Sequence, residues 1–109
     1  MATNYKVLGQ SNPSATTATT LYTVPAATQT IVSTITVCNQ TSTAGTYRVA
    51  VRVAGAALAA NQYVAYDVSL PGNATDTLTL GVTLGATDVI TVYASTANLS
   101  FNAFGSEIA

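Results

Sequence analysis

The sequence has 109 residues, enough for one domain with a modest core, and only 6% of them are charged. Ordinary soluble domains carry about a quarter of charged residues, whereas this chain has three cations, four acids and no histidine. Such a composition excludes nucleic-acid binding by phosphate neutralisation, which needs clustered lysine and arginine, and it excludes a disordered acidic or basic tail.

Residues 1–20 are expected to form an N-terminal strand or arm and a Ser/Thr-rich loop, ahead of a β-sandwich body at residues 21–109 within a single domain. Residues 5–8 are the strand candidate, and residues 11–20 are a low-complexity run that cannot pack a core. No basic segment followed by an apolar one opens the chain, so we expect no signal peptide. No apolar run approaches the roughly 18 residues of a membrane-spanning helix, so we expect no membrane partner.

From residue 21 onward apolar and polar residues alternate with a period of two, which is typical of β-strands. Turn-forming residues separate the alternating segments. Residues 55–62, rich in alanine, are either one short helix or a crossing loop. The pattern predicts an all-β fold of about eight strands, an antiparallel β-sandwich of jelly-roll type. The expected strands after the first are 21–24, 30–39, 46–54, 62–70, 76–84, 88–95 and 98–104.

One face of each long strand carries most of the apolar side chains and is expected to form the core. The residues on these faces are Ile31, Ile35, Val37, Tyr47, Val49, Val51, Val53, Leu78, Leu80, Val82, Ile90, Val92, Leu99 and Phe101.

Groups that carry catalysis or bind metals are scarce in this chain. No histidine can serve as the base for a serine or cysteine nucleophile. Asp67, Asp76 and Asp88 could offer a carboxylate pair or calcium ligands, but Asp76 and Asp88 begin strands beside turns, where aspartate caps backbone amides. We therefore expect no enzyme, no cofactor and no metal. Cys38 is expected to be a small buried residue, with an intermolecular disulfide or reactive thiol as the alternative.

The low charge bears directly on association. Sheet edges in this chain lack the lysines and glutamates that usually discourage edge-to-edge pairing, and a net charge of −1 gives little colloidal protection. The sequence therefore predicts an assembly of copies rather than a monomer. The six tyrosines are expected to pack in the core or in interfaces, with a carbohydrate-stacking platform as the alternative.

Two of the three cations, Arg48 and Arg52, are four residues apart in one expected strand and therefore project from the same outer face. They are either solvated charges or interface groups that pair with carboxylates. The carboxylates would be Asp67 or Asp88 of a neighbouring copy, or an acidic patch on a partner protein. The candidate partner-contact residues are Arg48, Arg52, Tyr5 and Lys6.

Several segments resemble the small virion structural proteins of tailed bacteriophages. The opening KVLGQ at residues 6–10 with Pro13, LYTVP at 21–25 and ITVCN at 35–39 carry the resemblance, which continues in TDVITVY at 87–93 and FNAFGSEI at 101–108. The similarity runs over most of the chain. Its motifs are structural and contain no catalytic residue.

Within that group, a jelly-roll-like chain of this size resembles capsid cement (decoration) proteins. The resemblance implies a protein of the virion, made in the bacterial cytoplasm, that forms a homo-oligomer, with a trimer favoured, and binds the major capsid protein. It would stabilise the head by joining neighbouring capsid subunits. The alternative is a β-sandwich module of a tail or fibre that binds a host-surface glycan through exposed tyrosines.

Overall fold

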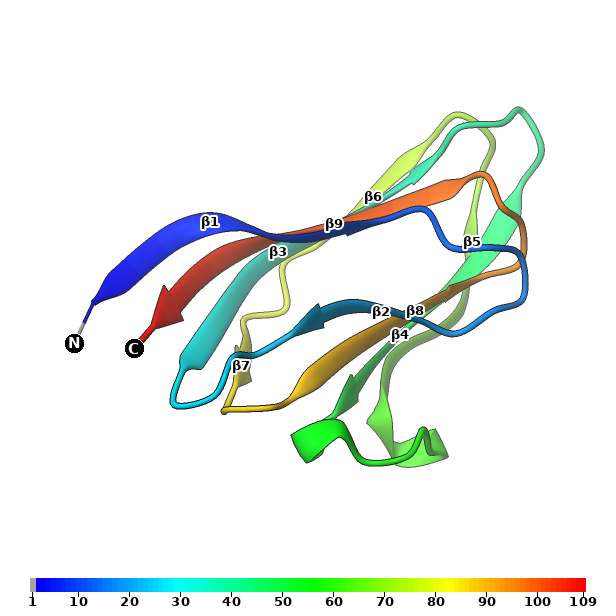
Figure 1. Ribbon diagram of the computed structural model, residues 1–109. Helices are drawn as coiled ribbons and strands as arrows, with labels where there is room; N and C mark the ends of the chain where they lie inside the picture. Colours follow the sequence, from blue (N-terminus) through cyan, green and yellow to red (C-terminus); the bar gives the residue numbers. More distant parts are fainter. Residues whose placement is uncertain (1) are drawn as a thin grey trace.

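Two antiparallel sheets stacked face to face make up the protein, as the computed structural model shows for residues 2–109 (Figure 1). Met1, the first residue of the expected N-terminal arm, lies outside the described residues. The strands are β1 (Thr3–Ser11), β2 (Thr19–Thr23), β3 (Gln29–Asn39), β4 (Gly45–Arg52), β5 (Tyr63–Leu70), β6 (Thr75–Leu78), β7 (Val82–Leu84), β8 (Val89–Ala94) and β9 (Leu99–Ile108).

The chain crosses from one sheet to the other after most of its strands. One sheet has the order β1-β9-β3-β6, with β7 also paired to β3, and the other has the order β2-β8-β4-β5. When β6 and β7 are taken as two halves of one strand, this is the connectivity of an eight-stranded jelly roll. The predicted all-β antiparallel sandwich is confirmed.

The count of nine strands, rather than eight, comes from a break in the segment predicted as one strand at residues 76–84. The chain pairs with β3 on both sides of the break. Gly81 sits between the halves with φ +65°, a left-handed conformation that ends a regular strand. Leu80, predicted to be in the core, is therefore exposed.

The core lies between the sheets and is built mainly by the predicted apolar faces. Tyr47 and Phe101 are fully buried, and their rings meet edge-on with centroids 6.1 Å apart. Cys38 is only half-buried, contrary to expectation, because its position in the alternation of β3 directs it to the outer face. Eight of the predicted core residues are buried: Ile35, Val37, Tyr47, Val49, Ile90, Val92, Leu99 and Phe101. Three others pack against the core while only partly buried: Val51, Leu78 and Val82.

A β-bulge in β3 accounts for another departure from the predicted core. The pairing of β3 with β9 shifts register between Val32 and Thr34, so Ser33 is an extra residue. Inward-facing positions are Val32 before the bulge and Ile35 after it, three residues apart rather than two or four. Strict alternation placed Ile31 inward, but the bulge turns it outward, where it is 42% exposed.

The segment predicted as a short helix or crossing loop joins β4 to β5 within one sheet and contains no α-helix. It has two 3₁₀ turns, η1 (Val53–Gly55) and η2 (Ala60–Gln62), with an irregular stretch between them. Because β4 ends at Arg52 and Ala54 has φ +53°, Val53 leaves the strand and is exposed instead of entering the core. In Figure 1 this loop lies on the side of the four-stranded sheet that faces away from the other sheet.

The two ends of the described chain lie next to each other at one end of the sandwich (Figure 1). The strand expected at residues 5–8 lies within the longer β1, an edge strand that pairs with β9 along its length. Backbone hydrogen bonds join Ala2 and Ala109 in both directions, at 2.7 and 2.9 Å.

Candidate functional site

Bulges in edge strand β5 bring tyrosines to the outer face of the four-stranded sheet. Along its pairing with β4, β5 contains one extra residue at each of two register shifts. Ala65 and Val68 both pack against the core, so Tyr66 and Asp67 between them both face outward. Asp67 takes the left-handed conformation there, with φ +49°. The ring of Tyr63 packs edge-on against that of Tyr66, with centroids 4.9 Å apart and an interplanar angle of 82°.

Arg48 of β4 lies between two tyrosine rings, those of Tyr66 and Tyr93. Its Cζ is 4.3 Å from the ring centroid of Tyr66 and 4.3 Å from that of Tyr93 on β8, both within the range of cation–π attraction. Its Nε and Nη2 donate to Oδ1 and Oδ2 of Asp67 at 2.6 and 3.3 Å. This hydrogen-bonded pair raises the pKa of Arg48 above its usual value. We call the five residues Tyr63, Tyr66, Tyr93, Arg48 and Asp67 the tyrosine–arginine cluster.

Arg52 hydrogen-bonds the loop beside the cluster. Its Nε donates to the carbonyl oxygen of Ala56 at 2.7 Å and its Nη2 to that of Gly55 at 3.0 Å. Its Nη1 reaches the Thr91 hydroxyl on β8 at 3.4 Å. The guanidinium thus ties the loop to the outer face of the sheet.

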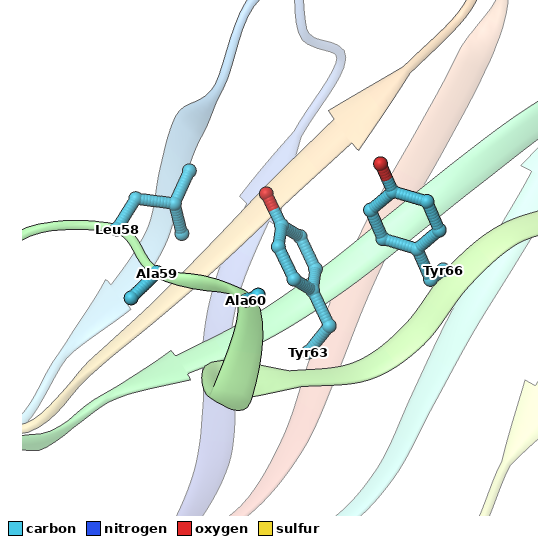
Figure 2. A pocket seen from close by; sticks show the side chains of 5 residues that line it. All are labelled: Leu58, Ala59, Ala60, Tyr63 and Tyr66. Carbon is cyan, nitrogen blue, oxygen red and sulfur yellow. The ribbon is translucent and has the colours of Figure 1, made fainter.

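A shallow depression opens between this loop and the cluster. It has a volume of about 580 Å³, and Figure 2 shows Leu58 on one side and the rings of Tyr63 and Tyr66 on the other. The loop wall is held in place by Gln62, whose side chain accepts from the Ala59 amide at 2.8 Å and donates to the Ala57 carbonyl at 2.9 Å. Within the described chain, neither tyrosine hydroxyl has a hydrogen-bond partner. The depression therefore combines apolar walls with free polar groups.

A second surface lies on the outer face of the five-stranded sheet, at the end that carries the termini. Tyr5 and Val7 of β1 are 86% and 49% exposed, and Ile31 of β3 is 42% exposed. Ser106 of β9 pairs with both Tyr5 and Ile31 and is buried, so the apolar side chains on either side shield it. We call this surface the terminal patch; its residues are Tyr5, Val7, Ile31, Phe104 and Ile108.

Lys6 points the other way, toward the space between the sheets. Its Nζ is 3.2 Å from Oε1 of Glu107. Tyr22 of the opposite sheet donates to Oε2 of the same carboxylate at 2.5 Å and also hydrogen-bonds Thr30. Glu107 thus joins β9 to β1 and to β2. Burial and the Glu107 hydrogen bond raise the pKa of Tyr22 to about 12.

Removing the Tyr22 hydroxyl should raise the pKa of Glu107 more than removing the Lys6 ammonium. The hydrogen bond from Tyr22 is the largest single cause of the lowered pKa of Glu107. Lys6 lowers it through a hydrogen bond and its charge, which solvent screens because 48% of the Lys6 side chain is exposed. A lowered pKa means that the carboxylate stabilises the fold above about pH 4.3, its usual pKa when unfolded, and that this contribution disappears as the pH falls through the folded value. Glu107 is the single glutamate of the chain, so its side-chain carboxyl ¹³C signal can be titrated without ambiguity.

We expect the midpoint of that titration to rise in Tyr22→Phe and to rise less in Lys6→Met. Asp88→Asn, which changes a carboxylate that binds the amides of Gly85 and Ala54 instead, is the control and should leave the midpoint unchanged. A larger shift in the lysine variant would contradict the assigned order of causes.

Other acidic residues have local partners. Asp88 caps backbone amides, as predicted, whereas Asp76 accepts a hydrogen bond at 2.8 Å from Tyr47. Among residues 2–109, no three histidine, cysteine or acidic side chains gather as metal ligands would. The same residues contain no helix long and apolar enough to cross a membrane.

The four candidate partner-contact residues do not lie on one surface. Arg48 and Arg52 do share the outer face of one sheet, as predicted, but their hydrogen-bond partners are within their own chain. Tyr5 belongs to the terminal patch on the other sheet, and Lys6 is turned inward. The sequence reasoning missed the grouping of Tyr63 and Tyr66, because residues three apart share a strand face only where a bulge intervenes.

Comparison of the chain with protein-family models, with curated proteins and with solved structures finds no significant match.

Proposed function

We propose that this chain is a structural protein of a tailed-phage virion, most specifically a capsid cement protein that stabilises the head by binding neighbouring subunits. The sequence segments that resemble phage virion proteins support this proposal. The fold agrees with it at the level of architecture, because jelly rolls occur in viral capsid proteins. Fold alone does not assign a function, so the support for this one has to come from the surface of the molecule.

The observation that carries the proposal is the terminal patch. It presents apolar side chains on a sheet whose edge strand β1 is free for residues 3–7. The one cation of that edge, Lys6, pairs with Glu107 while 48% of its side chain stays exposed. An exposed apolar surface beside an edge strand favours association with another protein or another copy. The expected assembly is a homo-oligomer, with a trimer favoured, on the surface of the major capsid protein.

Particles that contain the chain provide the test. We expect quantitative mass spectrometry to find hundreds of copies per particle, and light scattering of the pure protein to give about three times the chain mass of 11.1 kDa. Tyr5→Ser combined with Ile31→Ser should weaken retention on particles at least about tenfold, because exposed aromatic and aliphatic anchors carry much of an interface's binding energy.

Val64→Ser is the matched control, since Val64 is 46% exposed but lies on β5, in the other sheet. It should be retained like the parent. A folded double variant that is retained equally well would remove the terminal patch from the proposal. A handful of copies per particle would instead favour a tail or fibre location.

A tail or fibre module that binds host-surface glycan is the second candidate function. The tyrosine–arginine cluster favours it, because three tyrosine rings gather on one outer face beside an open depression. Lectin domains are also found among jelly rolls. Copy number separates this candidate from a cement protein.

A further inference from the structure

We propose that the depression beside the tyrosine–arginine cluster binds a neutral saccharide, with a pyranose ring packed against Tyr63 and Tyr66. This inference rests on the second candidate function and names its site and ligand class. The volume of the depression, about 580 Å³, falls within the usual range of small-ligand sites, about 300–1,000 Å³.

The cluster is held rigidly before any ligand arrives. The Arg48 guanidinium is fixed on two sides by tyrosine rings and by its two hydrogen bonds to Asp67. Tyr66 is in turn held between Arg48 and the ring of Tyr63. Rigid aromatic side chains lose little conformational entropy on binding, so a ligand gains most of the contact energy.

The charge of the site favours a neutral ligand. The positive charge of Arg48 is compensated by the carboxylate of Asp67, which accepts from its Nε and Nη2. The residues that line the depression carry no charge. An acidic peptide or a sugar acid would therefore find no counter-charge among the residues that line the depression.

The polar groups that remain match the hydroxyls of a sugar. Tyr63 and Tyr66 both line the depression, and neither uses its hydroxyl within the described chain. Figure 2 shows both tyrosine hydroxyls directed to the same side, with that of Tyr63 the nearer to Leu58. A pyranose presents C–H groups that pack on aromatic and aliphatic walls, and hydroxyls around its rim that both donate and accept hydrogen bonds. Both kinds of contact are available in this depression.

Saturation-transfer NMR on the purified protein tests the inference directly. The probes are the methyl pyranosides of glucose, galactose and mannose, the disaccharides maltose and lactose, and glucuronate as the anionic comparison. We expect at least one neutral probe to receive saturation through its ring C–H groups, and glucuronate to bind more weakly than glucoside.

Variants then locate the binding. Tyr66→Ala and Tyr63→Ala should each lower affinity for that probe about tenfold, the value of one aromatic contact. Tyr66→Phe keeps the ring and its packing against Arg48, so it should lose less affinity than Tyr66→Ala and it guards against a misfolded variant. Tyr5→Ala is the matched control, because Tyr5 is an exposed tyrosine on the other sheet and its substitution should not affect binding.

Absence of saturation transfer to all neutral probes would overturn the inference, as would binding that survives the Tyr63 and Tyr66 substitutions. If sugars do not bind but the two alanine variants leave phage particles, the cluster is a protein interface and the saccharide assignment is wrong. These results are independent of copy number, so the inference and the cement function can fail separately.

Discussion

Asn39→Asp is expected to destabilise the protein by about 3–5 kcal/mol at pH 7, although the two side chains have nearly the same shape. Asn39, at the end of β3, is 1% exposed. Its Nδ2 lies 2.9 Å from the Thr43 carbonyl oxygen and 3.3 Å from those of Leu70 and Pro71, while its Oδ1 accepts from the Thr41 amide. The single amide therefore fastens two loops at one end of the sandwich.

An aspartate at this position would aim an oxygen at three carbonyl oxygens. The carboxylate would be buried without a cation, and its pKa would rise well above the usual value because burial and the carbonyl dipoles both disfavour the charge. A folded-state pKa above the unfolded one means that stability is retained at low pH and lost as the pH rises through the folded value. The variant should consequently be more stable at pH 4 than at pH 7, relative to the parent.

Denaturant unfolding at the two pH values measures this effect. Asn102→Asp is the matched control, because Asn102 is only half-buried and accepts one hydrogen bond, from the Gln10 side chain. Its cost should stay below about 1 kcal/mol. Equal stability of the two variants at pH 7 would show that the Asn39 amide does not hold the loops.

Most of the sandwich could be predicted from the sequence because alternation with a period of two is a local property of the chain. Where strands run regularly, as at Tyr47 and Val49 or at Ile90 and Val92, the predicted inward residues are buried. Alternation cannot report an inserted residue, since a bulge depends on what the neighbouring strand does. In β3 one hint was present, because strict alternation from Ile31 to Ile35 places the polar Ser33 on the same inward face.

The same limitation explains why the candidate site was only partly predicted. That Arg48 and Arg52 face outward together follows from their spacing within β4, and the structure confirms it. The contacts of Arg48 with Tyr66 and Asp67 depend on the bulges of β5, and that with Tyr93 depends on the pairing of β4 with β8. These long-range pairings leave no mark in the local sequence. The terminal patch was likewise hidden, because its partners come from β1, β3 and β9.

Gly105→Ala is expected to destabilise the protein by about 3 kcal/mol, the upper range for overpacking a well-packed site. Gly105 lies in β9, the middle strand of its sheet at this end, paired with Lys6 on one side and Val32 on the other. A Cβ on Gly105 would lie 2.0 Å from the Ile31 carbonyl oxygen and 3.0 Å from the Val32 Cα. Both are backbone atoms, so no side-chain rotation can relieve the clash and the strands must separate.

Gly85→Ala is the matched control for this substitution. Its Cβ would meet only the Asp88 carboxylate, at an ordinary contact distance of 3.8 Å, and the amide that donates to that carboxylate is retained. Its stability should therefore equal or slightly exceed that of the parent, because alanine restricts the unfolded chain. Thermal unfolding of both variants measures the difference, and a Gly105→Ala protein as stable as Gly85→Ala would show that β9 and β3 are not in close contact.

Gly105→Ala should also disturb the terminal patch. Ile31 and Tyr5 flank Ser106, the next residue of β9, so separation of β3 from β9 moves Ile31 away from its neighbours on the patch. We expect amide hydrogen exchange in this variant to accelerate along residues 29–32 and 105–108 and to stay unchanged in β4 and β8 of the other sheet. Retention on particles should fall as it does for the Tyr5 and Ile31 double variant, while binding at the tyrosine–arginine cluster persists. If retention on particles and saccharide binding are lost together, the substitution unfolds the whole sandwich. The two surfaces could then not be treated as independent.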